Sequence, residues 1–92
     1  MLLEFDDAKS ARNVKERGIG FERFADMDLT RALSREDTRA EYGERRITLL
    51  GPIDERLHVA VITYRGDRVR VISLRRANRR EERMYAKESQ PT

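Results

Sequence analysis

The sequence predicts a single α+β domain over residues 1–92, with helices packed on one antiparallel sheet of about three or four strands. Helical periodicity with capping signals dominates the first part of the chain. Strand-like runs separated by turn signals follow, and a capping-box motif then begins a last helix. Together these observations give the order β-α-α-β-β-β-α, with two N-terminal helices and one C-terminal helix.

The N-terminal part contains one predicted strand and two predicted helices. The apolar run of residues 1–5 forms the strand and ends at an acidic pair. Asp6 can cap a helix over Asp7–Arg17, and Gly18 can end it, because glycine readily adopts the left-handed conformation that follows a helix. Apolar residues at helical spacing then predict a second short helix over residues 21–28.

The middle of the chain changes from helical to strand-like spacing. Residues 33–42 are polar, and we expect a short strand near Leu33 followed by an exposed loop. Arg46–Leu50 is typical of a strand, and the turn signal Gly51-Pro52 is expected to close it.

A hairpin follows, made of the predicted strands Leu57–Arg65 and Arg68–Arg75. Between them, Gly66-Asp67 has glycine in the first place, which predicts a two-residue type II′ turn. Apolar residues on both faces near the middle indicate that the hairpin is covered on both sides. The turn also fixes the facing pairs as Tyr64 with Val69, Ile62 with Val71, Ala60 with Ser73, and His58 with Arg75.

The last helix is predicted over Arg79–Glu88, with Asn78 as its cap and Glu81 three residues further on in capping-box spacing. Arg79 and Arg80 fall in its first turn, where cations oppose the helix dipole. Two arginines at this unfavourable end indicate either an anionic partner or contacts with nearby carboxylates, of which the candidates are those of Glu36, Asp37 and Glu44.

The composition excludes several classes of protein. None of the 92 residues is cysteine. This excludes a disulfide framework, a cysteine-based zinc site and thiol catalysis, and it favours a cytoplasmic protein. The apolar runs are too short for a membrane-spanning helix, so we expect no contact with a membrane. With 38% hydrophobic and 40% charged residues, the chain is polar but able to fold.

The charge is unevenly distributed along the chain. Residues 1–44 contain 8 Lys and Arg against 11 Asp and Glu, whereas residues 45–92 contain 12 against 6. Arginine outnumbers lysine 17 to 3. Because guanidinium groups bind phosphates in a bidentate manner, this favours a polyanionic partner, although a solvated surface is the alternative. Eight arginines lie within residues 65–83, at positions Arg65, Arg68, Arg70, Arg75, Arg76, Arg79, Arg80 and Arg83.

The residues that could perform chemistry are few. There is no metal-binding cluster, no glycine-rich phosphate loop and no set of residues for a nucleophilic triad. The single histidine lies in mid-strand, where a packing role is favoured over catalysis. Arginine can stabilise the negative charge that develops when RNA is cleaved, but a binding face without catalysis fits equally well. The candidates for proton transfer are Glu44, Glu81, Tyr64 and His58.

Three stretches of the sequence, in order and at matching spacing, resemble one family. They are Phe5-Asp6-Asp7-Ala8-Lys9 followed by Asn13, Gly18, Phe21 and Glu22; Tyr42-Gly43-Glu44-Arg45-Arg46 followed by Gly51; and the segment Arg65–Ala77 followed by Arg79, Arg80 and Glu81. Over residues 4–85 the chain resembles the BrnT family of bacterial type II toxins, small ribonucleases related to the RelE-like fold. It departs from the family pattern at Phe5, where tryptophan is usual, at Glu16-Arg17, which replaces Lys-His, and at His58, where the family tends to be apolar.

The resemblance implies an endoribonuclease toxin that cleaves RNA by attack of the 2′-hydroxyl group, needs no metal or other cofactor, and inhibits translation. It also implies a DNA-binding antitoxin as partner, with promoter DNA bound only through the complex. The expected catalytic residues are Arg65, Arg75, Arg79, Arg80 and Glu81, of which Glu81 is either a general base or a capping residue. The expected RNA-binding residues are Lys9, Arg45, Arg46, Arg70 and Arg76.

Two other functions remain open at this point. One is a non-catalytic, arginine-rich module of the same fold that binds nucleic acid or protein. The other is a structural partner of the antitoxin whose arginines serve the protein interface. Cleavage of RNA by the purified protein in a chelator distinguishes the toxin from both.

Overall fold

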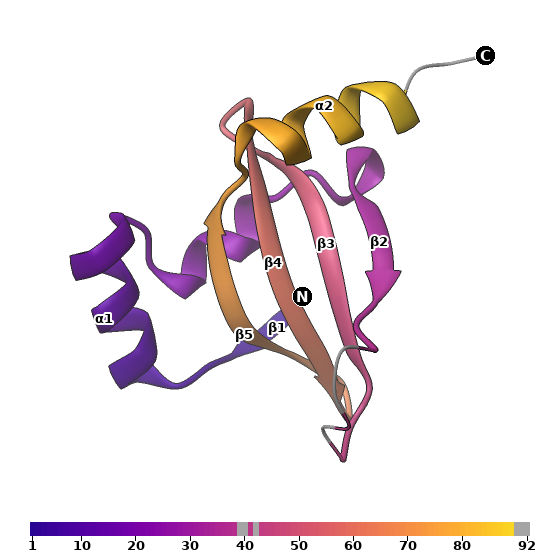
Figure 1. Cartoon of the computed structure of the whole chain (residues 1–92). Helices are drawn as coiled ribbons and strands as arrows, with labels where there is room; N and C mark the ends of the chain where they lie inside the picture. Colours follow the sequence, from indigo (N-terminus) through magenta and orange to yellow (C-terminus); the bar gives the residue numbers. More distant parts are fainter. Residues whose placement is uncertain (39–40, 42, 90–92) are drawn as a thin grey trace.

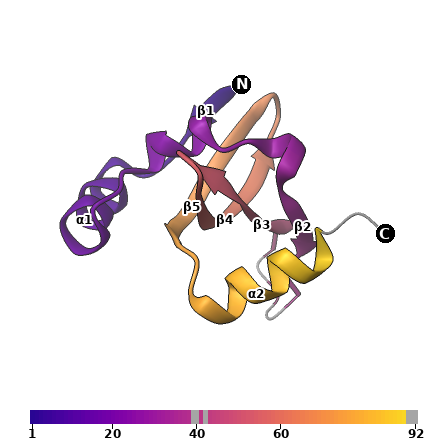
Figure 2. The same cartoon turned by 90° about the horizontal axis from the view of Figure 1, so that it is seen from above.

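The computed structural model describes residues 1–38, 41 and 43–89. A five-stranded sheet forms its centre; the helix α1 lies beside one edge, two short 3-10 helices pack on one face, and α2 crosses one end of the other face (Figures 1 and 2). The strand order in the sheet is β1-β5-β4-β3-β2. In chain order the elements are β1 (Leu2–Glu4), α1 (Asp7–Arg17), η1 (Phe21–Asp26), η2 (Leu29–Arg31), β2 (Leu33–Glu36), β3 (Arg46–Ile53), β4 (Arg56–Arg65), β5 (Arg68–Arg76) and α2 (Arg79–Glu88).

The α+β class is confirmed, but the sheet is larger than predicted and is not wholly antiparallel. β1 pairs with β5 in parallel, and β2 adds a fifth strand at the opposite edge. Parallel strands require a long connection, and here α1, η1, η2 and three strands lie between β1 and β5 in the chain. An ion pair of 2.9 Å between Glu4 and Arg70 reinforces this pairing.

Both predicted α-helices with capping signals are confirmed. α1 covers Asp7–Arg17, Asp6 accepts a hydrogen bond of 3.0 Å from the backbone N–H of Lys9, and Gly18 ends the helix with φ of 75°. α2 covers Arg79–Glu88 and begins with the complete capping box of Asn78 and Glu81. Short polar side chains at the helix ends therefore determine these two elements locally.

The second predicted helix, over residues 21–28, is present over Phe21–Asp26 but is the 3-10 helix η1 and not an α-helix, and a further 3-10 helix, η2, follows it at Leu29–Arg31. The buried side chains of Phe21, Phe24 and Met27 recur every third residue. A 3-10 helix has three residues per turn, so this spacing places all three on the core face. Asp28 begins the second 3-10 helix by accepting a hydrogen bond from the backbone N–H of Thr30 at 3.1 Å.

The predicted turn at Gly51-Pro52 is also wrong, because β3 continues through both residues to Ile53. The turn lies at Asp54 and Glu55, whose φ angles of 51° and 60° fit a two-residue type I′ hairpin. Pro52 is tolerated in the strand because its pair with Leu57 is the second from the turn, where a backbone N–H points away from the partner strand.

Gly51 has a packing role in this strand rather than a turn role. A Cβ atom at this position would lie 2.9 Å from Cβ of Ala32 and 3.0 Å from the sulfur of Met27. The glycine therefore allows the segment after η1 to pack closely against β3.

The predicted hairpin is confirmed near its turn but shifts in register further along. Gly66 has φ of 62°, and the pairs of Tyr64 with Val69 and of Ile62 with Val71 form as predicted. A β-bulge then leaves Ile72 as the extra residue of β5. Beyond it the predicted pairs are wrong, because Ala60 faces Leu74, Val59 faces Arg75 and His58 faces Arg76.

The bulge decides which side chains of β5 enter the core. The core lies between the sheet and the 3-10 helices, and Leu74 is fully buried there with Ala60 and Ile62. Arg75 therefore points to the opposite face, whereas the predicted register placed it on the same face as Ala60. Asn13 of α1 fixes this part of β5, since its side-chain amide donates to the carbonyl of Leu74 at 2.8 Å.

The predicted exposed loop after Leu33 is only partly tested. The short strand expected near Leu33 is confirmed as β2, whereas Asp37 beyond it is buried rather than exposed. Its backbone N–H donates to the carbonyl of Arg46 at 2.8 Å. Residues 39, 40 and 42 of this loop, and residues 90–92 after α2, lie outside the described part of the chain.

Candidate active site

A groove of about 580 Å³ crosses the face of the sheet that carries α2. Its floor consists of two rows of side chains, because residues paired across adjacent strands share one face of the sheet. The middle of the floor is mainly apolar, and an arginine stands at each side. Across β2, β3, β4 and β5, one row is Leu33, Leu50, Val59 and Arg75, and the other is Arg35, Thr48, Val61 and Ser73.

α2 forms one wall of the groove through Glu81, Met84 and Glu88. None of the residues Arg79–Glu88 is buried, so apolar burial contributes little to holding this helix in place. Tyr85 anchors the helix by donating a hydrogen bond of 2.6 Å from its hydroxyl group to the carbonyl of Arg31. This contact holds α2 above the β2 side of the groove.

The second anchor of α2 joins the two predicted catalytic residues Arg75 and Glu81. Nη1 and Nη2 of Arg75 each lie 2.9 Å from a carboxylate oxygen of Glu81, in a bidentate arrangement. Glu81 also accepts a hydrogen bond of 2.9 Å from the backbone N–H of Asn78. Both contacts favour the ionised carboxylate, and Arg75 in particular lowers the pKa of Glu81 below its usual range. The arrangement fixes the guanidinium group at the edge of the groove.

The lowered pKa of Glu81 predicts an acid-dependent loss of stability. The pair with Arg75 stabilises the folded state above the ordinary glutamate pKa of about 4.3, and this contribution disappears as the pH falls through the lower folded value. We expect Glu81→Gln to unfold at a lower denaturant concentration than the unmodified protein at pH 7, and we expect this difference to shrink as the pH falls below the ordinary glutamate pKa of about 4.3. A difference that is unchanged over this range would show that the charge of Glu81 is not the stabilising feature.

The other three predicted catalytic residues do not line the groove. Arg79 and Arg80 are exposed in the first turn of α2, close in sequence to the Arg75–Glu81 pair. Arg65 stands at the far end of β4, six residues from the partner of Arg75, which corresponds to about 20 Å along a strand. Its nearest ionic partner is Glu44, at 3.5 Å.

Two of the predicted RNA-binding residues lie beside the groove on the same face of the sheet. Arg46 on β3 and Arg70 on β5 both pair with Thr63 of β4. These three residues form the next row along the strands, beyond the groove floor and nearer the hairpin turn. Carboxylates partly neutralise both, since Glu44 lies 3.7 Å from Arg46 and Glu4 lies 2.9 Å from Arg70. The basic face therefore extends beyond the groove toward the hairpin turn.

The remaining predicted RNA-binding residues, Lys9, Arg45 and Arg76, lie outside the groove. Arg45 forms an ion pair of 2.8 Å with Glu36. Lys9 is exposed in the first turn of α1, and Arg76 is exposed at the end of β5. None of these three side chains lines the groove.

Of the four candidates for proton transfer, only Glu81 lines the groove. His58 is buried and belongs to the opposite face of the sheet, since its neighbour Val59 faces the groove. Its Nδ1 lies 2.7 Å from the carbonyl oxygen of Arg56. Tyr64 is exposed on that opposite face as well, and Glu44 pairs with arginines near the hairpin turn.

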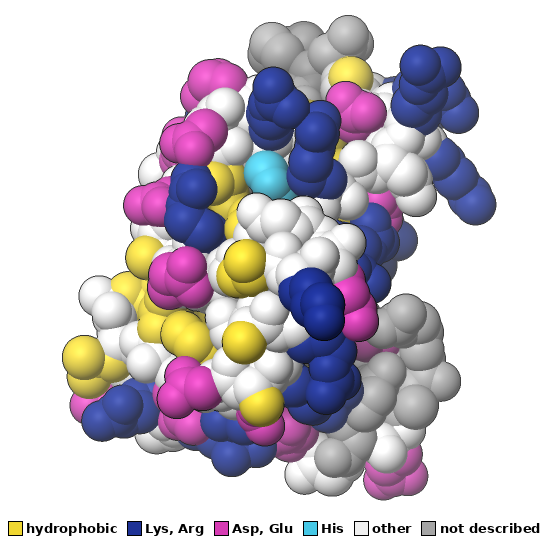
Figure 3. All heavy atoms as spheres, turned by 90° about the vertical axis from the view of Figure 1, so that its left-hand side faces the viewer, with side chains coloured by type: hydrophobic (Ala, Val, Ile, Leu, Met, Phe, Trp, Pro, Cys, Tyr) yellow, Lys and Arg dark blue, Asp and Glu magenta, His cyan; other side chains and the backbone are white. Residues whose placement is uncertain are grey.

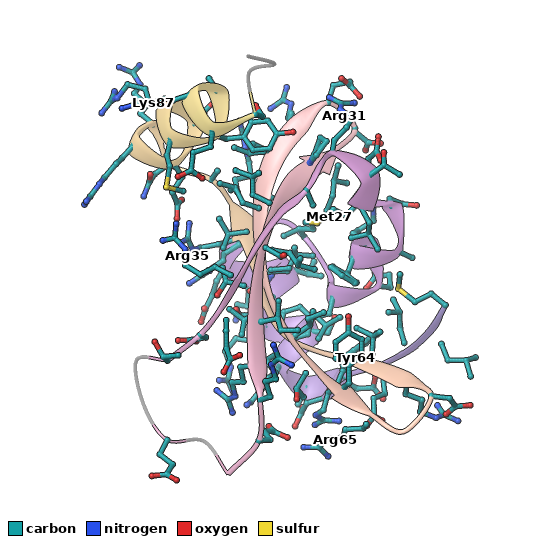
Figure 4. All side chains as sticks on the ribbon, turned by 90° about the vertical axis from the view of Figure 1, so that its right-hand side faces the viewer. Met27, Arg31, Arg35, Tyr64, Arg65 and Lys87 are labelled. Carbon is teal, nitrogen blue, oxygen red and sulfur yellow. The ribbon has the colours of Figure 1, made fainter. Side chains whose placement is uncertain are left out.

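Sequence reasoning missed two arginines that line the groove. Arg17 approaches from the end of α1, and Arg35 stands on β2 and extends toward the side on which α2 lies (Figure 4). Within the described part of the chain, neither makes an ion pair. Arg35 was overlooked because its segment is short and polar, and only its pairing with Thr48 places it in the floor.

Positive charge is concentrated on the groove side of the molecule. In Figure 3, most of the visible Lys and Arg side chains lie toward the right-hand side, on which α2 lies, and several Asp and Glu side chains follow the left-hand margin. Among the described residues there is no group of three or more His, Cys, Asp or Glu side chains that could hold a metal ion. No helix in this part of the chain has the length and apolar character needed to cross a membrane.

The fold and the groove define a small α+β protein with an arginine-containing site on one face of its sheet. A family model described as ribonuclease toxin, BrnT, of type II toxin-antitoxin system matches residues 5–81, and the chain therefore belongs to this family. Membership implies a ribonuclease toxin of a type II system with an antitoxin as its partner. The comparison with curated proteins gave no match.

Proposed function

We propose that the protein is an endoribonuclease that cleaves RNA by attack of a 2′-hydroxyl group on the adjacent phosphate, without a metal ion. The observation that supports this most directly is the guanidinium group of Arg75, held by Glu81 at the edge of a groove that contains two further arginines. Positive charge fixed in this way is suited to a transition state in which negative charge develops on phosphate oxygens.

Each part of the groove has a role in this reaction. Arg75 donates hydrogen bonds to the phosphate that is cleaved, and Glu81 is a positioning residue that orients it. The lowered pKa of Glu81 supports this role over that of general base, because an efficient base has a pKa near the working pH. Arg79 and Arg80 attract the RNA to the end of the groove formed by the first turn of α2. Arg65, Arg46 and Arg70 extend the binding face.

The biological consequence follows from the substrate. Cleavage of messenger RNA by the free toxin inhibits translation in the cytoplasm. The antitoxin binds the toxin and suppresses this activity, and its own DNA-binding domain allows the complex to repress the promoter.

Addition of a chelator tests whether cleavage requires a metal ion. We expect the purified protein to cleave RNA equally well with and without EDTA and to leave 2′,3′-cyclic or 3′-phosphate ends, because arginine supplies the positive charge. The end groups can be identified by mass spectrometry of a short oligonucleotide. Arg75→Ala purified in the same way controls for contaminating ribonucleases. Loss of cleavage in EDTA that Mg²⁺ restores would contradict the proposed mechanism.

A non-catalytic binding module is the second candidate. It is favoured by one observation, that the described residues lining the groove include no histidine. A module of this kind would bind the same oligonucleotide without producing any cleaved ends, so the same experiment separates the two functions.

A further inference from the structure

We propose that Arg35 forms a second phosphate-binding subsite, which holds a flanking phosphate of a single-stranded RNA that crosses the sheet from β5 to β2. This inference rests on the proposed ribonuclease function and adds a requirement on the substrate. Efficient cleavage requires an unpaired strand long enough to contact both Arg75 and Arg35.

The strand register places the two arginines at opposite sides of the groove. Arg75 ends one row of the floor on β5, and Arg35 begins the adjacent row on β2. Three strand spacings across the sheet and one row along the strands separate them, which together correspond to about 16 Å. A stacked strand advances by about 3.4 Å per nucleotide, so a segment of about five nucleotides or fewer spans this distance. The scissile phosphate and a flanking phosphate can therefore occupy the two positions together.

The charges around Arg35 leave it available for a ligand. The neighbouring carboxylate of Glu36 is paired with Arg45 at 2.8 Å, whereas no ion pair involves Arg35 among the described residues. Asp37 and Glu88 also line the β2 side of the groove. Arg35 therefore places a positive charge on the same side of the groove as these carboxylates.

The floor between the arginines favours a single strand over a duplex. Leu50 and Val59 are buried there, and the side chain of Val61 lies beside them. The partly exposed Val61 and the guanidinium planes of Arg35 and Arg75 can accept the faces of unpaired bases, whereas the bases of a duplex are stacked on one another and unavailable. α2 bounds the groove above this floor.

Arg35→Gln tests the subsite, with Arg56→Gln as the matched control. Arg56 is an exposed arginine at the start of β4, on the opposite side of the sheet, and it makes no ion pair among the described residues. We expect Arg35→Gln to reduce kcat/KM for a single-stranded RNA of ten nucleotides by at least about tenfold, mainly through KM. Cleavage of a dinucleotide, which cannot reach Arg35, should be unchanged. Arg56→Gln should affect neither substrate.

Binding measured without cleavage separates this inference from the proposed function. For a 2′-O-methyl RNA of ten nucleotides, we expect Arg35→Gln to weaken binding at least about tenfold. The slope of log K against log salt concentration should also fall by about 0.7, the value for one phosphate contact to a single strand. An unmodified protein that binds this RNA but cleaves no substrate would refute the ribonuclease function alone. Binding by Arg35→Gln equal to that of Arg56→Gln, or an equal loss of cleavage on both substrates, would refute the subsite.

Discussion

Replacing Arg75 by alanine should abolish RNA cleavage while the protein remains folded. Removal of one positioned donor to a transition-state oxyanion typically lowers the rate by about 10²–10³-fold. The effect on stability should be small, because the side chain of Arg75 is 38% exposed and ion pairs of this exposure contribute less than about 1 kcal/mol. Both hydrogen bonds of the capping box at the start of α2 join Asn78 and Glu81 and do not include Arg75. Cleavage rate and thermal unfolding measured on the same sample check both expectations.

Two further variants make this experiment decisive. Arg75→Lys retains the charge but loses the planar fork that binds Glu81 in a bidentate manner, so we expect its activity to remain low. Arg56→Ala removes an arginine outside the groove and should keep full activity. A folded Arg75→Ala variant as active as the unmodified protein would place the active site elsewhere. If Arg75→Ala unfolds, Arg75 has a structural role.

The double variant Arg79→Gln with Arg80→Gln should lose function without losing stability. We expect its melting temperature to be preserved or raised, because each cation in the first turn of a helix costs about 0.3–1 kcal/mol. RNA cleavage or antitoxin binding should fall at least about tenfold, which corresponds to about 1.4 kcal/mol. Thermal unfolding, cleavage and titration with the antitoxin provide the three measurements.

The contacts of these two arginines support this expectation. Neither makes an ion pair among the described residues, so the alternative that they reach the carboxylates of Glu36, Asp37 or Glu44 is not found there. Glu82→Gln offers a control in the same helix, since it removes an exposed charge of the favourable sign from the first turn. A lower melting temperature of the double variant, together with unchanged cleavage and antitoxin affinity, would show that Arg79 and Arg80 serve the fold.

Local chemistry explains which elements the sequence could predict. Asp6, Gly18 and Asn78 act on the backbone within three or four residues, so the bounds of both α-helices were predicted correctly. Gly51-Pro52 was misread because its strand conformation depends on β4 and on the segment after η1. Such contacts come from distant parts of the chain and leave no local pattern.

The candidate site likewise contains some residues that the sequence could identify and others that only the folded structure reveals. Arg75 and Glu81 were selected through their match to a family motif, and the structure brings them into contact. Arg35 could not be selected, because it enters the floor only through the pairing of β2 with β3. The hairpin turn correctly fixed the nearest pairs of β4 and β5, but it could not reveal the extra residue at Ile72.

That extra residue makes the length of β5 a functional property in its own right. Successive side chains of a strand alternate between its faces, so deletion of Ile72 would remove the bulge and leave Leu74 in the core and Arg75 in the groove. Insertion of one more residue between Val71 and Leu74 without a second bulge would instead turn Arg75 into the core and Leu74 into the groove. An exchange of one apolar side chain for another at Ile72 leaves this alternation intact. During evolution, this stretch can therefore vary in sequence, or lose the codon of Ile72, far more freely than it can gain a codon.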